Sequence, residues 1–408
     1  MNALSDIRWR LAVPLLVCWA IYLFADTFVT PAIRIPIPPA MAVLACMIGP
    51  KGMRGGLWQL MRPPRWSYPL VAIFLLQAFR DPGANALFYL VFITALMVFR
   101  TFAPDTAGYD RLCRLLYGVL VASSVLLLLS QIQPALGLGV RVLLFGQGVL
   151  ERPYPAGFAQ LVHTYGYQVA ALGAISLVLA AHNLDGAKRR QGVALIVLSH
   201  AGAVLLFGMQ RSAVIGATAA WLWVVRRMRA QRFAYIAVVG TTVMLGIILV
   251  LPLQQALETT VVGKDQQDTS KSMRWQLQAE TVQIILEHPW GLMVEGRTWT
   301  PDLFRWGGAL SSTGLSGHNA FLMTIAFLGL PSLLLIGWTL GKGIAWMNSL
   351  GAGSMASPWP MAMAAVFLAT TVNALFHNSS LFSAEGSTMI AYVALGHWND
   401  LRREGDRN

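Results

Sequence analysis

Long apolar stretches follow one another along the chain, separated by short polar or Gly/Pro-rich connections. Several stretches reach 18 residues with few charges, which is long enough for a helix to cross the roughly 30 Å hydrocarbon core of a bilayer. The alternation of polar and apolar residues that is typical of a membrane β-strand does not occur. Because a helix satisfies its own backbone polar groups in lipid, the pattern predicts an all-α, polytopic membrane protein.

The pattern predicts about 12 membrane-spanning helices. Their ranges are 11–30, 32–49, 67–80, 86–103, 112–131, 161–182, 192–209, 211–225, 233–252, 319–338, 358–376 and 380–397. No small-residue cleavage site follows the first range, so we interpret it as a retained helix rather than a signal peptide. We expect residues 1–408 to form a single membrane domain.

One segment departs from this pattern. Residues 253–317, between the ninth and tenth predicted spans, carry 12 charged residues, although the whole chain is 56% apolar and only 12% charged. Within the segment, residues 273–287 have apolar positions at helical spacing. Ser272 is a candidate N-cap, and Pro289 with Gly291 ends the pattern. We therefore expect a water-facing helical segment inserted into the membrane domain.

Basic residues orient the predicted helices. With the N-terminus in the cytoplasm, 20 of the 30 Lys and Arg residues fall in inside segments, five in short outside connections, Arg141 among them, and five in residues 253–317. Since cytoplasmic loops are enriched in Lys and Arg, we expect both termini in the cytoplasm and a periplasmic segment 253–317. The net charge of +12 fits contact with anionic lipids, and no soluble basic domain is available to bind nucleic acid.

Neither cysteines nor known motifs indicate a metal or a cofactor. Cys18, Cys46 and Cys113 lie in or beside apolar stretches without ligand spacing, which is typical of small buried hydrophobic residues. The chain has no Walker loop, no H-E-x-x-H, no nucleophile elbow and no paired Asp cluster. We therefore predict a site of Arg and His side chains, with no metal and no cofactor.

Arg211 is the single charged residue between positions 191 and 225. An arginine at membrane depth costs about 2.5–3.5 kcal/mol on insertion scales, so it needs a partner or a function. It is either the cation of a site for a phosphorylated ligand or the arginine of a tight outer turn that reaches lipid phosphate.

Arg274 and His318 are the other two main candidates. Arg274 lies in the first turn of the predicted helix, where a cation opposes the helix dipole but suits an anion site; the alternative is an exposed arginine on an outer helix. His318 begins the tenth span, and histidine is the side chain best matched to proton transfer near pH 7. A lone histidine at a membrane surface is otherwise simply interfacial.

Further candidates have less support from their context. His377 precedes the last span, Glu385 is an acid within that span, and Arg152 and His163 lie near the start of the sixth span. The tryptophans after residue 289 have small polar neighbours and either stack on sugar rings or form an interfacial aromatic belt, and we favour the belt.

Three motifs in this order resemble those of the O-antigen ligase family of Gram-negative inner membranes. They are Arg211-Ser212-Ala213 at a tight outer turn, Arg274-Trp275 leading to Pro289-Trp290-Gly291, and Gly317-His318-Asn319 at the return to the membrane. The resemblance covers residues 190–340 by motif and the whole chain by topology, whereas residues 151–167 match no family pattern.

The resemblance implies a GT-C-like fold and an inner-membrane glycosyltransferase that acts on the periplasmic side. Its donor would be undecaprenyl-pyrophosphate-linked O-antigen glycan, and its acceptor a sugar hydroxyl of the lipid A–core oligosaccharide. Arg211 and Arg274 match the family's two essential arginines, and His318 matches its essential histidine. The predicted substrate-binding residues are Arg211, Arg274, Trp275, Asn319, Arg152 and His377.

The expected reaction is an inverting, metal-independent displacement with His318 as the base. Glu280 and Glu295 are competing bases. An O-antigen polymerase uses the same donor and is a rival interpretation. A protein O-oligosaccharyltransferase is disfavoured because the chain ends 11 residues after its last predicted span. A transporter is disfavoured because charges at mid-membrane and repeated broken spans are lacking.

Overall fold

The computed structural model describes residues 3–25, 37–49, 63–80, 82–146, 157–159, 162–184, 188–208, 210–227, 271–300, 303, 317–350, 357–376 and 386–405, and these form helices without any strand. Among these described residues, five helices are long and apolar enough to cross a membrane: Asp6–Phe24, Thr106–Ile132, Tyr165–Asn183, Arg190–Phe207 and Trp359–Phe376. A helical, multi-pass membrane protein is therefore confirmed, whereas the number of 12 spans stays a prediction.

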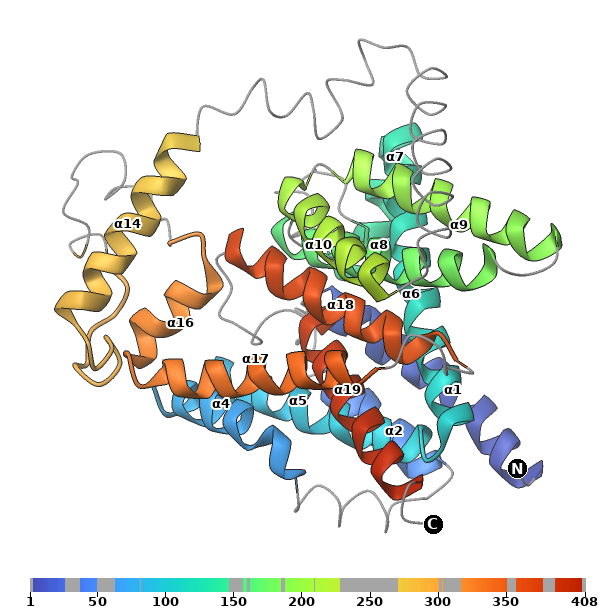
Figure 1. Ribbon diagram of the computed structural model, residues 1–408, viewed down its shortest axis with the longest axis horizontal. Helices are drawn as coiled ribbons and strands as arrows, with labels where there is room; N and C mark the ends of the chain where they lie inside the picture. The colour runs from blue at the N-terminus through green and yellow to red at the C-terminus, as the bar shows by residue number, and fades with distance from the viewer. Residues whose placement is uncertain are drawn as a thin grey trace.

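The helices are shown in Figure 1. The first group is α1 (Ala3–Phe24), α2 (Ile37–Ile48), η1 (Arg65–Ser67), α4 (Tyr68–Arg80), α5 (Pro82–Phe102), α6 (Thr106–Ile132) and α7 (Pro134–Phe145). The second is α8 (Val162–Leu184), α9 (Lys188–Phe207) and α10 (Arg211–Arg227). The third is α14 (Lys271–Glu287), α16 (Ala320–Leu328), α17 (Ser332–Ser349), α18 (Trp359–Asn373), η4 (Ala374–Phe376) and α19 (Gly386–Gly405). The ninth predicted span, 233–252, lies outside the described residues.

Helix α18 is the centre of the fold. It packs against α8, α10, α17 and α19, and most of its residues are buried on every side. Its contact with α10 is especially close, because a side chain at Gly216 would overlap the carbonyl oxygen of Ala369. Small residues that let backbones approach are typical of membrane helix packing. Sequence-distant helices are thus held at short range around α18.

Polar contacts between segments that are distant in the sequence hold one end of the bundle together. We call this end the paired end. They are Arg111 with Asp6 (3.1 Å), Trp66 with Asp400 (2.9 Å), Ser357 with Asp110 (2.6 Å), Arg227 with Asn348 (3.0 Å) and Arg402 with the Ser349 carbonyl (3.1 Å). Segments that the basic residues predicted to share one face of the membrane therefore do lie together. The starts of α1, α6 and α18 and the ends of α10, α17 and α19 meet here.

The predicted span 319–338 is wrong as a single helix. The chain forms α16, then a turn through Gly329 and Pro331, then α17. Gly329 has φ 80° and ψ 172°, a conformation that is essentially restricted to glycine. The Leu292 N–H donates to the Ala326 carbonyl (2.9 Å), and the Leu330 N–H to the Pro289 carbonyl (2.8 Å). The break exists because the chain after α14 pairs with the end of α16.

The connection between the fifth and sixth predicted spans was also incompletely predicted. It contains α7, whose 12 residues are too few to be recognised as a span. Arg141, which was assigned to an outside connection, is only 2% exposed and donates from Nη2 to the Ala159 carbonyl (3.1 Å). Gly137 permits this arrangement, because any side chain there would overlap Ser130 of α6.

Candidate functional site

Arg211 is the first residue of α10 and is half-buried. Residues 208–210 alone separate α10 from α9, so the tight turn predicted from the sequence is confirmed. The turn begins at Gly208, where a side chain would come within 2.7 Å of the Val204 carbonyl oxygen and 3.0 Å of Val169 on α8. The turn is therefore pressed onto α8, which sets the direction in which α10 starts.

The packing of α10 places Arg211 at the end of the bundle opposite the paired end. Arg227, the last residue of α10, bonds to Asn348 at the paired end, and Gly216 meets Ala369 on α18. Gly216 is near the start of α10 and Ala369 near the end of α18, and η4, which follows α18 directly, contacts α16. We call the start of α10, η4, α14 and α16 the site end; α14 packs on α16, and α16 contacts η4 at the end of α18.

His318 has the backbone conformation that stands out most at the site end. Its φ is 47°, and among the described residues no other non-glycine residue has a positive φ. The left-handed region costs an L-residue roughly 1–2 kcal/mol. Such strain persists where the surrounding structure enforces it, and it clusters at functional sites. The half-buried His318 is therefore held in place by its neighbours rather than by its own preference.

Gly317 explains what enforces this conformation. It is buried, and a side chain at this position would overlap the hydroxyl oxygen of Thr281 on α14. Thr281 in turn donates to the Leu277 carbonyl (2.6 Å). Gly317, which precedes His318, is thus in direct contact with the middle of α14. This contact fixes the position of the backbone from which the imidazole projects.

Asn319 fixes the other side of His318. It is the N-cap of α16, and its Oδ1 accepts hydrogen bonds from the N–H groups of Phe321 (3.0 Å) and Leu322 (3.1 Å). An asparagine directly before an apolar helix is a recognised start signal, so this capping role was available from the sequence. Its predicted role in substrate binding stays a prediction.

The first turn of α14 carries the second predicted arginine. The helix begins at Lys271, two residues earlier than expected, so Ser272 lies inside the first turn and the predicted cap is wrong. The backbone of Arg274 is in this turn, as expected, but its side chain lies outside the described part of the structure. Trp275 beside it is 75% exposed. Its exposure leaves the indole accessible from outside the bundle.

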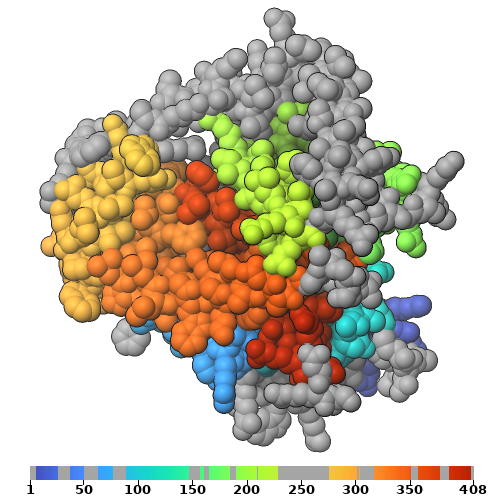
Figure 2. Space-filling model, viewed as in Figure 1, coloured from blue at the N-terminus to red at the C-terminus, as the bar shows by residue number. Residues whose placement is uncertain are grey.

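The buried face of α14 has helical spacing and one unexpected member. Leu277, Glu280, Thr281, Ile284 and Ile285 are buried, at the spacing of a single helix face. This face packs on α16, and Figure 2 shows α14 and the α16–α17 region as one continuous surface. The predicted apolar face is confirmed at Leu277, Ile284 and Ile285, and a carboxylate lies in its centre.

The family model described as O-antigen ligase matches residues 192–337, a range that includes Arg211, α14 and His318. This part of the chain belongs to the O-antigen ligase family. All three motifs that carried the resemblance lie inside the matched range, so the family assignment made from them is confirmed. A comparison with curated proteins gives no match.

The two competing carboxylates of the O-antigen ligase segment differ in their surroundings. Glu280 is 1% exposed at the junction of α14 with α16, next to the residue that contacts Gly317. Glu295 lies in an exposed turn, where its Oε2 is 2.5 Å from His288 Nδ1 and 3.8 Å from Arg297 Nε. Glu295 is therefore part of a surface ion cluster, whereas Glu280 belongs to the interior beside the site end.

Several predicted site residues are not placed. Arg152, His377 and Glu385, and the side chain of His163, lie outside the described residues. Within the described ranges, no three His, Cys, Asp or Glu side chains are grouped to hold a metal ion. Cys46 and Cys113 are buried and Cys18 is half-buried, all with free thiols.

Proposed function

We propose that the protein is an O-antigen ligase of the bacterial inner membrane. It transfers O-antigen glycan from undecaprenyl-pyrophosphate to a sugar hydroxyl of the lipid A–core oligosaccharide. The observation that carries this proposal is the strained His318, held between α14 and the cap of α16 inside the family-matched range. The site end, with Arg211 at the start of α10, faces the periplasm, and both termini face the cytoplasm.

Arg211 and Arg274 stabilise the leaving group. Negative charge grows on the phosphate oxygen as the bond to the anomeric carbon breaks, and a guanidinium there stabilises the transition state more than the ground state. Loss of one such interaction costs on the order of 2.7–4 kcal/mol, by analogy with oxyanion-hole deletions. Pyrophosphate is already a good leaving group, so the reaction needs neither a general acid nor a metal ion.

His318 accepts the proton of the acceptor hydroxyl. The hydroxyl oxygen bonds to the anomeric carbon as the bond to the pyrophosphate oxygen breaks, and the proton moves to the neutral imidazole. A direct displacement inverts the anomeric configuration. Glu280, buried beside the Gly317 contact, is the competing base.

Ligation with purified components tests the proposal. The full chain in detergent or nanodiscs is given undecaprenyl-pyrophosphate glycan together with purified lipid A–core. Glycan transferred to lipid A–core supports a ligase. Elongation of lipid-linked glycan without lipid A–core transfer identifies a polymerase, and lipid-linked glycan crossing a bilayer without transfer identifies a transporter.

Substitutions test the assigned roles in the same assay. His318→Ala with near wild-type ligation removes His318 as the base. Normal binding of the donor and normal turnover by Arg211→Ala and Arg274→Ala remove the leaving-group role. Complete loss of activity with EDTA contradicts the metal-independent reaction.

A further inference from the structure

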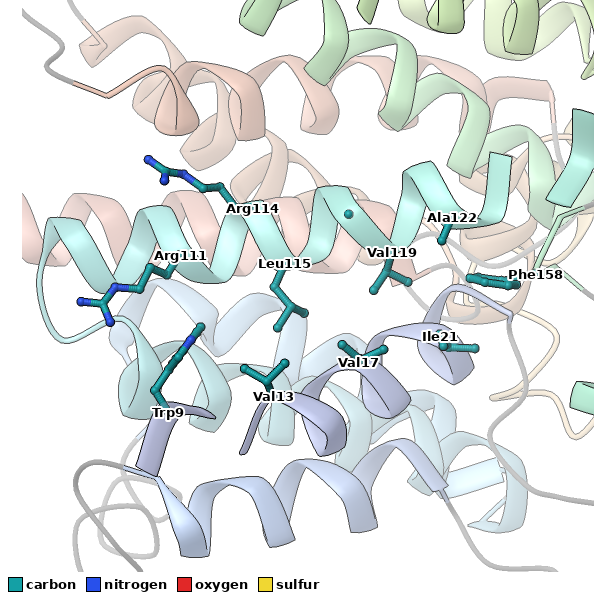
Figure 3. A pocket seen from close by; sticks show the side chains of 11 residues that line it. Trp9, Val13, Val17, Ile21, Arg111, Arg114, Leu115, Val119, Ala122 and Phe158 are labelled. Carbon is teal, nitrogen blue, oxygen red and sulfur yellow. The ribbon is translucent and has the colours of Figure 1, made fainter. Parts of the chain in front are cut away.

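A groove runs between α1 and α6 (Figure 3). Val13 and Val17 of α1 face Leu115 and Val119 of α6 across it, and Phe158 closes its inner end. Its volume of about 490 Å³ is within the range of ligand-binding pockets. Both helices are long and apolar enough to span a membrane, so we expect the groove to lie within the bilayer.

Two arginines line the mouth of this groove. Arg111 and Arg114 project from the start of α6, and Trp9 of α1 forms the wall beside them. Arg111 is held by Asp6 at 3.1 Å, and Arg114 is exposed. Arg111 and Arg114 are the charged residues that line the groove. Asp6 is paired with Arg111, and Asp110 accepts a hydrogen bond from Ser357 (2.6 Å), so Arg114 is the exposed cation at the mouth.

The groove has the length of one lipid leaflet. From Arg111 to Ala122, α6 advances roughly 16 Å at about 1.5 Å per residue. Half of the hydrocarbon core is roughly 15 Å thick. An acyl chain that lies in the groove therefore ends near Phe158 when its headgroup phosphate is beside the two arginines. Basic pockets between membrane helices are known to bind anionic headgroups.

We propose that this groove binds an anionic glycerophospholipid, with the phosphate at Arg111 and Arg114 and one acyl chain between α1 and α6. The site is separate from the proposed transfer reaction. Its mouth is at the paired end, next to the Arg111–Asp6 and Ser357–Asp110 contacts, whereas Arg211 and His318 lie at the opposite end. A polyprenyl donor positioned for His318 has its phosphates at that opposite end, so a structural phospholipid is the occupant.

Gly118 offers a way to block the groove without disturbing the fold. It lines the groove, and a side chain at this position meets nothing within 4 Å. Leucine is a better helix former than glycine, so Gly118→Leu fills the groove while favouring α6. Gly337 of α17 is equally open, which makes Gly337→Leu the matched control.

Native mass spectrometry of the delipidated full chain tests the site. Phosphatidylglycerol, phosphatidylcholine and undecaprenyl phosphate are added separately and in competition. We expect tight phosphatidylglycerol binding by the wild type and by Gly337→Leu, and loss of that binding in Gly118→Leu. The double variant Arg111→Gln/Arg114→Gln should weaken it roughly thirtyfold, from about 1 kcal/mol per arginine. Arg226→Gln, an exposed arginine on α10, should leave it unchanged.

Three results overturn the proposal. Equal binding of phosphatidylcholine removes the role of the headgroup charge. Unchanged phosphatidylglycerol binding in Gly118→Leu shows that the lipid lies elsewhere. Displacement of phosphatidylglycerol by undecaprenyl phosphate in the wild type, together with loss of direct undecaprenyl phosphate binding in Gly118→Leu, assigns the groove to the polyprenyl lipid. Thermal unfolding of each variant without lipid verifies folding, and the ligation assay is independent of all three readouts.

Discussion

The two ends of the helix bundle are held together in different ways. At the paired end, side chains bridge sequence-distant helices, as Trp66 does with Asp400 and Arg227 with Asn348. At the site end, segments approach closely at glycines: Gly216 meets the Ala369 backbone, Gly329 the Trp290 backbone, and Gly317 the Thr281 side chain. Side-chain bridges tolerate small displacements, whereas close contacts at glycine do not.

This difference indicates why the site end contains the family motifs. A catalytic group has to be held within about half an ångström of its productive position, and close contacts at glycine meet that requirement. His318 follows such a glycine and precedes a helix cap, so both of its neighbours are fixed. The paired end needs only to keep its helices together. Substitutions at the two ends should therefore differ in whether they affect activity or only stability.

The largest expected effect comes from a comparison of the same substitution, His to Asn, at the two ends of the bundle. His318→Asn should lower ligation 10²- to 10⁴-fold, because it removes the general base. The fold should be kept, since asparagine adopts the left-handed region more readily than most residues. His397→Asn is the control, since its ring contacts the Ala103 carbonyl (2.6 Å) near the paired end. Equal loss of activity in both variants contradicts the comparison.

Arginine substitutions at the two ends of α10 come next. Arg211→Ala should lower turnover by about 10²- to 10³-fold, the scale of one oxyanion-hole donor. Arg227→Ala removes hydrogen bonds to Asn348 and to the Leu350 carbonyl, so it should lower thermal stability and leave turnover near wild type. Steady-state rates and unfolding temperatures of both variants provide the test, and the reverse pattern refutes it.

The backbone contact at the break between α16 and α17 is the third target. Gly329→Ala should destabilise the protein by about 1–3 kcal/mol from its φ and ψ alone, and the overlap with Trp290 adds to this. Gly341→Ala in α17 meets open space and should be stabilising by about 0.5–1 kcal/mol. Thermal unfolding in detergent measures both. A neutral Gly329→Ala shows that the break is not rigid.

The cap of α16 should have a smaller effect. Asn319→Ala removes the acceptor for the Phe321 and Leu322 N–H groups and should cost about 1 kcal/mol. Because the cap is adjacent to His318, turnover should fall as well, whereas Asn319→Asp keeps the cap and most of the stability. If Asn319→Asp keeps the stability of the wild type but loses as much turnover as Asn319→Ala, the amide acts on substrate, as the sequence predicts.

The smallest expected effect is at the paired end. Burial raises the pKa of Asp400, beyond the last predicted span, although Trp66 and Arg100 oppose the shift. The folded state then holds this proton more tightly than the unfolded chain does, so stability falls as pH rises above the ordinary range of the carboxyl group. Asp400→Asn should flatten this part of the pH–stability profile and leave ligation unchanged. An identical profile in the variant contradicts the assignment.

The sequence by itself determined the class of the protein and its main chemical candidates. The free energy of transferring a segment into lipid is a sum over its own residues, so helices such as α6 and α18 were predictable without tertiary contacts. The turn before Arg211 and the end of α14 were predictable for the same local reason, because glycine and proline act on their own backbone. The motifs around Arg211 and His318 indicated the family that the match to residues 192–337 confirmed.

Only the tertiary structure decided how these parts meet. The break at Gly329, the burial of Glu280 and Arg141, and the left-handed backbone of His318 depend on contacts with segments far away in the chain. Hydropathy treats a stretch such as 319–338 as one helix, because it contains no information about the backbone hydrogen bonds with residues 289–293. Packing brings α10, η4, α14 and α16 to one end, since close backbone approach is a property of pairs of helices and not of any single one.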